Sequence, residues 1–225
     1  MTNNTDKIID NITAKTDKCI LFLSLGKDSL VLLDLIYPKF DKIYCVFMYF
    51  VKDLEHIERW KRWVKIRYPR ITLYQCPHFA LSYVLRSGLF CSPNPNVKLL
   101  SLTHIIKGVK AKFGCEYVFL GMKKADSMTR RVMLMTYKDN LYENNGVVYP
   151  LAEWTNKEVI AYMKHKGMPQ PVRYGKKASG GVGLNLDCHL WLRENFPQDL
   201  EKIYKAFPMS RKILFDYDYN RENKE

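Results

Sequence analysis

Apolar and polar residues alternate along this chain in a pattern that predicts strands followed by helices. Short apolar segments typical of strands lie at residues 19–23, 43–48, 71–76, 116–120 and 147–151. Helical patterns follow them at residues 29–37, 53–68, 100–113, 155–166 and 186–207. This alternation indicates right-handed βαβ units. The sequence therefore predicts an α/β fold: an open, mostly parallel five-stranded sheet with helices on both faces, plus a C-terminal helical extension.

The amino-acid composition indicates a folded protein of a reducing compartment. Hydrophobic residues make up 47% of the 225 positions and aromatic residues 13%, which excludes an intrinsically disordered chain. The six cysteines are scattered without a Cys-x-x-Cys pair, unlike those of a disulfide-stapled domain. Residues 1–18 are polar, and no apolar run approaches the roughly 20 residues of a membrane span. We expect a cytoplasmic protein without a membrane partner.

The chain divides by composition into three parts. Residues 1–166 carry the strand–helix alternation, residues 167–215 a basic loop and the helical extension, and residues 216–225 a polar tail that we expect to be disordered. Lys and Arg number 36 against 23 Asp and Glu, a formal charge of +13. This excess favours polyanionic partners or serves solubility alone, and composition does not decide between the two.

The turn after the first strand, Ser-Leu-Gly-Lys-Asp-Ser, has the residue types of a phosphate-binding loop. It opens a helix, whose first N–H groups and positive dipole end attract anions. Gly26 lets the backbone approach phosphate oxygens, Lys27 adds a positive charge, and Ser24 and Ser29 add hydroxyl donors. Asp28 is suited to holding Mg²⁺. The alternative is an ordinary capped turn, and the spacing is not that of a Walker A loop.

A second candidate phosphate clamp follows the fourth strand. Ligands of parallel α/β sheets bind beyond the carboxyl ends of the strands, where this segment is expected to lie. It combines a glycine with four cations and a hydroxyl; the alternative is a solvated basic loop. The candidate nucleotide-binding residues of the segment are Gly121, Lys123, Asp126, Ser127, Arg130 and Arg131.

These segments resemble those of the phosphoadenosine phosphosulfate (PAPS) reductase and N-type ATP pyrophosphatase superfamily. The first turn resembles its Ser-Gly-Gly-x-Asp-Ser pyrophosphate loop (PP-loop), with Leu25 at the first Gly, where a negative φ would make leucine tolerable. The segment from Gly121 resembles Gly-x-Arg-x-x-(acid)-Ser-x-x-Arg. Residues 149–159 resemble Pro-Leu-x-x-Trp-Thr-x-x-(acid)-Val, where Thr155 and Glu158 have the spacing of a helix capping box. The resemblance implies an adenine nucleotide alpha-hydrolase-like fold, with residues 1–166 as the nucleotide-binding domain.

The resemblance implies chemistry on an adenine nucleotide and leaves three alternatives. In the first, the PP-loop binds ATP and Mg²⁺, Lys27 and Asp28 act at the phosphates, and an acceptor is adenylylated with release of pyrophosphate. In the second, a thiolate attacks the sulfur of PAPS and thioredoxin completes the reduction, with Cys188 as the nearest candidate nucleophile. The third is a non-catalytic protein that binds a nucleotide or a nucleic acid. The Lys27-Asp28 pair favours ATP.

Cysteine and histidine spacing indicates no metal centre. Family members with an iron–sulfur cluster hold it with four thiolates in two pairs, whereas Cys91 and Cys188 stand singly at those places. We therefore expect no iron–sulfur cluster. The histidines are dispersed, without the spacing of metal ligands.

Residues 57–70 are the candidate surface for an acidic or nucleic-acid substrate such as tRNA or DNA. This predicted helix carries six cations against one acid, with Trp60 and Trp63 between them. The alternative, which the periodicity favours, is an amphipathic helix with its tryptophans toward the core and its cations in water.

Overall fold

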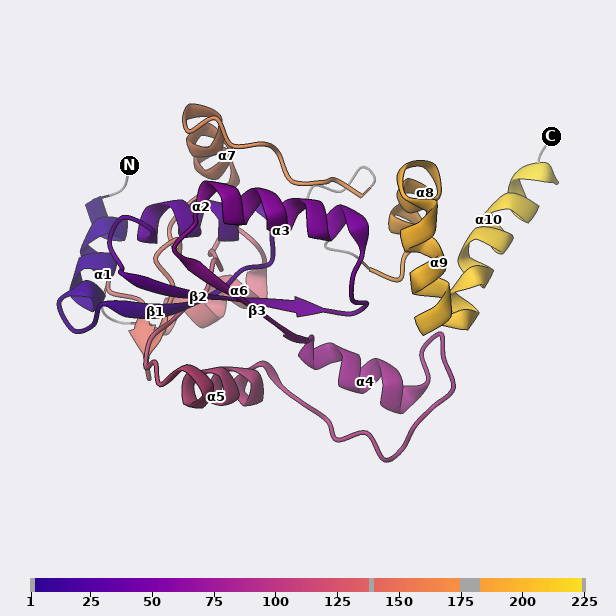
Figure 1. The fold of residues 1–225 in the computed structure, drawn as a ribbon, viewed down its shortest axis with the longest axis horizontal. Coiled ribbons are helices and arrows are strands. Elements are labelled where there is room, and N and C mark those ends of the chain that lie inside the picture. The colour runs from indigo at the N-terminus through magenta and orange to yellow at the C-terminus, as the bar shows by residue number, and fades with distance from the viewer. Residues whose placement is uncertain (1–2, 138–139, 175–182, 224–225) are drawn as a thin grey trace. The chain divides into compact units, whose positions relative to one another are not determined.

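The structure is a computed structural model that describes residues 3–137, 140–174 and 183–223, and the chain divides into two compact units (Figure 1). Neither unit is continuous in sequence. The last crossing between them, after Pro171, lies close to the boundary predicted at residue 166. Unit 1 comprises Met1–Met48, Lys65–Cys76 and Thr103–Pro171, and unit 2 comprises Tyr49–Val64, Pro77–Leu102 and Val172–Glu225.

Unit 1 is built on a six-stranded sheet with the order β3-β2-β1-β4-β6-β5. Strand β1 pairs in parallel with β2 and β4, and β4 pairs in parallel with β6. Strand β5 runs antiparallel to β6 and is one strand more than the five predicted. The predicted α/β fold with a mostly parallel sheet is confirmed. The strands are β1 (Lys18–Phe22), β2 (Lys42–Tyr49), β3 (Ile71–Pro77), β4 (Val118–Phe119), β5 (Glu143–Asn144) and β6 (Val147–Val148).

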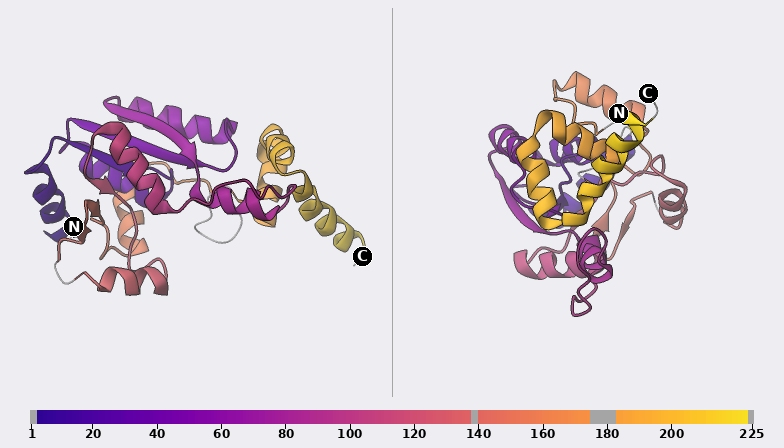
Figure 2. Two further views of the ribbon diagram at one scale, coloured as in Figure 1. Left: turned by 90° about the horizontal axis from the view of Figure 1, so that it is seen from below. Right: turned by 90° about the vertical axis from the view of Figure 1, so that its right-hand side faces the viewer.

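Helices cover both faces of this sheet, as predicted (Figures 1 and 2). Helices α2 and α7 lie together on one face and α5 on the other. The predicted capping box is present, because the Thr155 hydroxyl accepts from the Glu158 N–H while Glu158 accepts from the Thr155 N–H. The helices are α1 (Asn3–Thr13), α2 (Lys27–Ile36), α3 (Glu55–Arg67, its last turn in unit 1), α5 (Leu102–Phe113), α6 (Met128–Met135) and α7 (Asn156–His165).

Unit 2 is helical. It contains α4 (Phe79–Ser87), α8 (Leu186–Asn195), α9 (Pro197–Ala206), the 3₁₀ helix η1 (Pro208–Ser210) and α10 (Arg211–Glu222). The single helix predicted over residues 186–207 is two helices, because Pro197 lacks the N–H that would continue α8 and instead starts α9. None of the described helices is long and apolar enough to cross a membrane.

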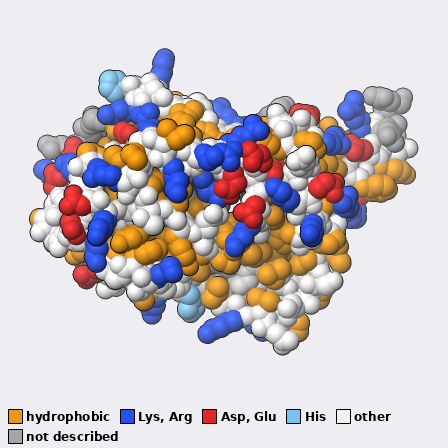
Figure 3. All heavy atoms as spheres, viewed as in Figure 1, with side chains coloured by type: hydrophobic (Ala, Val, Ile, Leu, Met, Phe, Trp, Pro, Cys, Tyr) orange, Lys and Arg blue, Asp and Glu red, His pale blue; other side chains and the backbone are white. Residues whose placement is uncertain are grey.

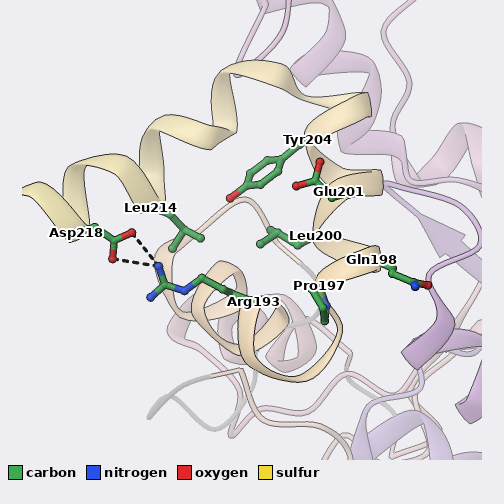
Figure 4. A pocket seen from close by; sticks show the side chains of 8 residues that line it. All are labelled: Arg193, Pro197, Gln198, Leu200, Glu201, Tyr204, Leu214 and Asp218. Atoms are coloured by element: carbon green, nitrogen blue, oxygen red, sulfur yellow. Dashed lines mark hydrogen bonds and ion pairs between the residues drawn. The ribbon is translucent and has the colours of Figure 1, made fainter.

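The prediction of a disordered tail over residues 216–225 is wrong as far as Glu222, because α10 includes those residues. An ion pair of 2.8 Å between Arg193 and Asp218 and the buried Leu214 side chain hold this helix to its neighbours. The three helices α8, α9 and α10 enclose a groove of about 450 Å³ (Figure 4). None of the predicted site residues lines it. The lining residues are Arg193, Pro197, Gln198, Leu200, Glu201, Tyr204, Leu214 and Asp218.

Candidate active site

Two loops meet at the carboxyl edge of the sheet of unit 1. The candidate PP-loop (residues 24–29) connects β1 to α2, and the segment from Gly121 follows β4, the neighbour of β1. The two come into close contact at Gly121, where a Cβ atom would lie 3.3 Å from the carbonyl carbon of Asp28 and 3.3 Å from the nitrogen of Ser29. A side chain at this position would push the loops apart. The absence of a side chain at Gly121 therefore allows the two loops to pack closely against each other.

The PP-loop is held together by its two serines. The hydroxyls of Ser24 and Ser29 lie 3.1 Å apart, and the Ser29 hydroxyl donates to the Gly26 carbonyl at 3.0 Å. Gly26 is the N-cap of α2, and its carbonyl also accepts the first helical bond, from Leu30, at 3.1 Å. The N–H groups of the first turn of α2 therefore begin at this loop, which gives it the anion-attracting end of a helix.

Leu25 has a φ of +60°, in the left-handed region, so the negative φ that would make leucine tolerable is not present. The loop keeps the backbone conformation that suits glycine although the residue is leucine. A non-glycine residue in this region costs about 1 kcal/mol or more. Burial of the leucine side chain, 6% exposed, offsets that cost.

Lys123 joins the two loops. Its Nζ atom lies 2.6 Å from Asp28 Oδ1 and 2.7 Å from Asp126 Oδ1, and its side chain is fully buried. Lys27 contacts the other oxygen of Asp28 at 2.8 Å. The Asp28 carboxylate thus bridges two ammonium groups. In this geometry Lys123 ties the two loops together, and its role as a phosphate ligand stays a prediction.

Asp126 organises the second loop. Its second oxygen accepts from Arg130 at 2.7 Å and from the backbone N–H of Lys123 at 3.0 Å. Burial acts to raise the pKa of Asp126, but the hydrogen bonds from Lys123 and Arg130 outweigh it and lower the pKa below its usual value. Asp126 is therefore held ionised. Ser127 caps α6 by accepting from the Arg130 N–H at 3.2 Å.

The charges of the site leave a positive excess. Lys27, Lys123 and Arg130 face two carboxylates, and the exposed Arg131 adds another cation at the start of α6. A phosphate chain entering the site would meet these cations and the α2 N-terminus. Among the described residues, no group of three or more His, Cys, Asp or Glu could hold a metal ion by itself.

Sequence reasoning missed the partners of Lys124. Its Nζ lies 2.6 Å from Glu153 and 2.7 Å from the Tyr142 hydroxyl, which also donates to Glu153. These hydrogen bonds raise the pKa of Lys124. Lys124 is committed to this network and is not a phosphate ligand in this arrangement. The sequence feature that could have indicated this network is Glu153, the acidic residue before Trp154 in the segment 149–159.

Cys188, the candidate nucleophile of the reductase alternative, is fully buried in the hydrophobic core of unit 2 together with Leu192 and Phe207. Burial raises the pKa of its thiol to about 11, whereas a nucleophilic cysteine needs a lowered pKa. Of the cations that precede Cys188 in the sequence, Arg173 is exposed, and Lys176 and Lys177 lie outside the described residues. The environment of Cys188 is that of a packed apolar side chain.

A mostly parallel sheet of this order, with a helix-opening loop after its first strand, defines the doubly wound class of α/β proteins. The sequence model of the phosphoadenosine phosphosulfate reductase domain matches residues 18–177, and the chain belongs to this family. No curated protein sequence matches it.

The solved structures similar to this chain include three enzymes. FMN adenylyltransferase of Candida glabrata in complex with ATP is 16% identical, with a TM-score of 0.53 over 80% of this chain and 60% of that one. NH3-dependent NAD synthetase of Campylobacter jejuni is 13% identical, with a TM-score of 0.51 over 96% and 94%. PAPS reductase of Candida auris is 15% identical, with a TM-score of 0.49 over 76% and 82%. At these identities the likeness concerns the fold.

Proposed function

We propose that this protein is an enzyme that binds ATP through the PP-loop and cleaves it between the α- and β-phosphates, transferring the adenylyl group to an acceptor. The observation that supports this most is the joining of the two loops through Asp28, Lys123 and Asp126. Because the two loops are joined, the partly exposed cations Lys27 and Arg130 lie on loops that adjoin one another at the α2 N-terminus. The neighbouring adenylyltransferase, whose structure contains ATP, is consistent with such a use of the fold.

In the reaction, the β- and γ-phosphates bind the N–H groups at the start of α2 and the Lys27 ammonium group. An acceptor oxygen attacks the α-phosphorus, the bond from that phosphorus to the oxygen bridging to the β-phosphorus breaks, and the acceptor proton passes to water. Negative charge develops on the departing pyrophosphate, where Lys27, Arg130 and Arg131 stabilise it. No side-chain nucleophile is needed.

Asp28 is the residue that would hold Mg²⁺ together with phosphate oxygens. A single carboxylate plus phosphates is a usual environment for this ion, and the Asp28 side chain is 22% exposed. Bound there, Mg²⁺ would neutralise charge on the phosphates. Lys27 would then exchange its contact with Asp28 for a phosphate oxygen, while Lys123 keeps its contact with Asp126.

The reductase alternative and the non-catalytic alternative have less support. The buried Cys188 thiol, with its raised pKa, is poorly suited to attack PAPS. Thioredoxin-dependent sulfite release from PAPS that disappears in Cys188→Ser would contradict our proposal in favour of the reductase. Nucleotide binding without any formation of AMP, with all acceptors tried, would favour the non-catalytic alternative.

The test is incubation with α-labelled ATP and Mg²⁺, followed by separation of AMP-containing products and pyrophosphate. Lys27→Ala should weaken ATP binding by about 10- to 100-fold, the range expected for losing a charged hydrogen bond. Lys107→Ala is the matched control, because Lys107 is an exposed lysine on α5. An unchanged affinity in Lys27→Ala would contradict phosphate binding by the PP-loop.

A further inference from the structure

A basic surface lies at the C-terminal ends of α3 and α7 in unit 1. We call it the α3–α7 basic patch and define it by five exposed cations. Arg67 donates to the Lys166 carbonyl at 3.0 Å, which joins the two helix ends. In Figure 3, Lys and Arg side chains gather on the face where α7 and α3 lie in Figure 1. The patch consists of Lys65, Arg67, Arg70, Lys164 and Lys166.

The first half of α3 is different, although sequence reasoning treated residues 57–70 as one surface. Arg59 and Arg62 both pair with Glu55, at 3.1 and 2.8 Å. Lys61 is buried and pairs with Glu58. Two carboxylates thus pair with the three cations of the first half, so most of the positive excess of the helix lies in its last turn.

Few negative charges oppose the patch. Asp34 is the carboxylate that lies near it in the described part of the chain, 3.9 Å from both Arg67 and Lys166. Asp34 also accepts hydrogen bonds from the hydroxyls of Tyr68 and Tyr162, at 2.8 and 2.7 Å. Asp34, already bound by two hydroxyls, lies within 4 Å of two of the five cations. The patch therefore keeps an excess of about four positive charges.

Aromatic rings lie beneath the guanidinium groups. The Arg70 guanidinium carbon is 4.4 Å from the centroid of the Tyr37 ring, and Arg70 also donates to the Tyr37 carbonyl at 2.7 Å. The Arg67 guanidinium lies over the Tyr68 ring at 5.7 Å. Arginines fixed in this way lose little side-chain entropy when they bind an anion. Cations interleaved with aromatic rings are typical of surfaces that follow a nucleic-acid backbone.

We propose that the α3–α7 basic patch binds the phosphate backbone of a nucleic acid. Cations at helix C-termini also stabilise the helix dipole, but one or two per helix would be enough for that purpose. Helices that link parallel strands run opposite to them, so the patch belongs to the amino edge of the sheet and the PP-loop to the carboxyl edge. The surface is thus separate from the proposed ATP site and independent of its chemistry.

The test measures fluorescence anisotropy of a labelled DNA duplex and a labelled RNA hairpin, without nucleotide, over a series of salt concentrations. Lys65→Glu/Lys164→Glu should weaken binding at least about tenfold at about 0.1 M salt and reduce the slope of log affinity against log salt by about 2. These two side chains make no hydrogen bond or ion pair with the described residues, so the fold should survive. Arg67→Gln/Arg70→Gln should weaken binding likewise.

The matched control is Lys107→Glu/Lys157→Glu, which changes the net charge equally on α5 and on the first turn of α7. It should change the affinity by less than about threefold, as expected for screened, distant charges. Equal weakening by the control, unchanged affinity in both patch variants, or binding of the wild-type protein to anionic vesicles but to neither nucleic acid would each overturn the proposal. Because no ATP is present, failure here leaves the proposed reaction unaffected.

Discussion

Leu25 combines a strained backbone with a buried side chain, and two substitutions separate these effects. Leu25→Gly and Leu25→Ala both remove apolar burial, but only glycine relieves the left-handed φ of 60°. We expect Leu25→Gly to be more stable than Leu25→Ala by about 0.5–1 kcal/mol, the reverse of the order at ordinary positions. Urea unfolding measures the difference. An alanine variant that is at least as stable as the glycine variant would contradict a positive φ at this residue.

At the residue scale, the sequence allows candidate site residues to be predicted but not the contacts that these residues make. Asp28, Lys123 and Asp126 could be selected because a motif fixes residue types at spacings along the chain. Lys123 is 95 positions from Asp28 in the sequence, and its burial between two carboxylates requires the intervening chain to bring β1 and β4 side by side. The φ of Leu25 could not be inferred either, because a leucine ordinarily avoids that conformation.

At the scale of elements, Lys123 connects the loop after β1 to the loop after β4. Its replacement should therefore destabilise both loops. Lys123→Met would leave Asp28 and Asp126 without their shared cation, and breaking such a buried pair costs about 3–5 kcal/mol. Lys123→Met/Asp126→Asn should recover part of that loss, because one unpaired carboxylate is removed as well. Denaturant unfolding gives these values.

The control for Lys123→Met is Lys107→Met, in which an exposed lysine is replaced and little change is expected. A loss below about 1 kcal/mol in Lys123→Met, or a double variant no more stable than the single one, would show that the ammonium group does not hold the loops. Weakened ATP binding in Lys123→Met with full stability would instead make Lys123 a phosphate ligand.

The elements that escaped sequence analysis are helices α1, α4 and α6, and two elements that bury little, strand β5 and helix α10. Strand β5 has two polar residues, Glu143 and Asn144, and no apolar periodicity. The turn Asn145-Gly146, with φ values of 50° and 73°, was the available hairpin signal. Helix α10 was missed because its apolar side chains are partly exposed, among them Phe215 and Tyr219, which stack on each other. Periodicity detects a buried face, and these two elements bury little.

At the scale of the whole molecule, the division into two discontinuous units could not be predicted from the sequence. Residues 49–64 and 77–102 look like ordinary connections of an α/β domain, yet they belong to unit 2. Contacts far apart in sequence explain this membership: Asp199, at the start of α9, accepts from the N–H groups of Glu55 and His56 and from the His56 ring, at 2.7, 3.1 and 2.7 Å.

Unit 2 should lose stability in mild acid, because two of its histidines, His56 and His189, are buried and a third, His78, is half-buried. Burial lowers the pKa of His56, His78 and His189 below the usual value. The unfolded chain then binds protons that the folded unit does not, so stability is full above about pH 6.5 and falls as the pH drops below it. At pH 5 the free energy of unfolding is lower by at most about 2 kcal/mol per histidine.

Hydrogen exchange followed by mass spectrometry resolves this prediction by region, after correction for the intrinsic pH dependence of exchange. Between pH 7 and pH 5, protection should fall in α8 and α9 of unit 2 and change little in β1 and α2 of unit 1, because the described histidines of unit 1, His104 and His165, are exposed. His189→Gln should reduce the acid effect, since glutamine does not take up a proton. Equal loss of protection in both units would contradict the assignment to buried histidines.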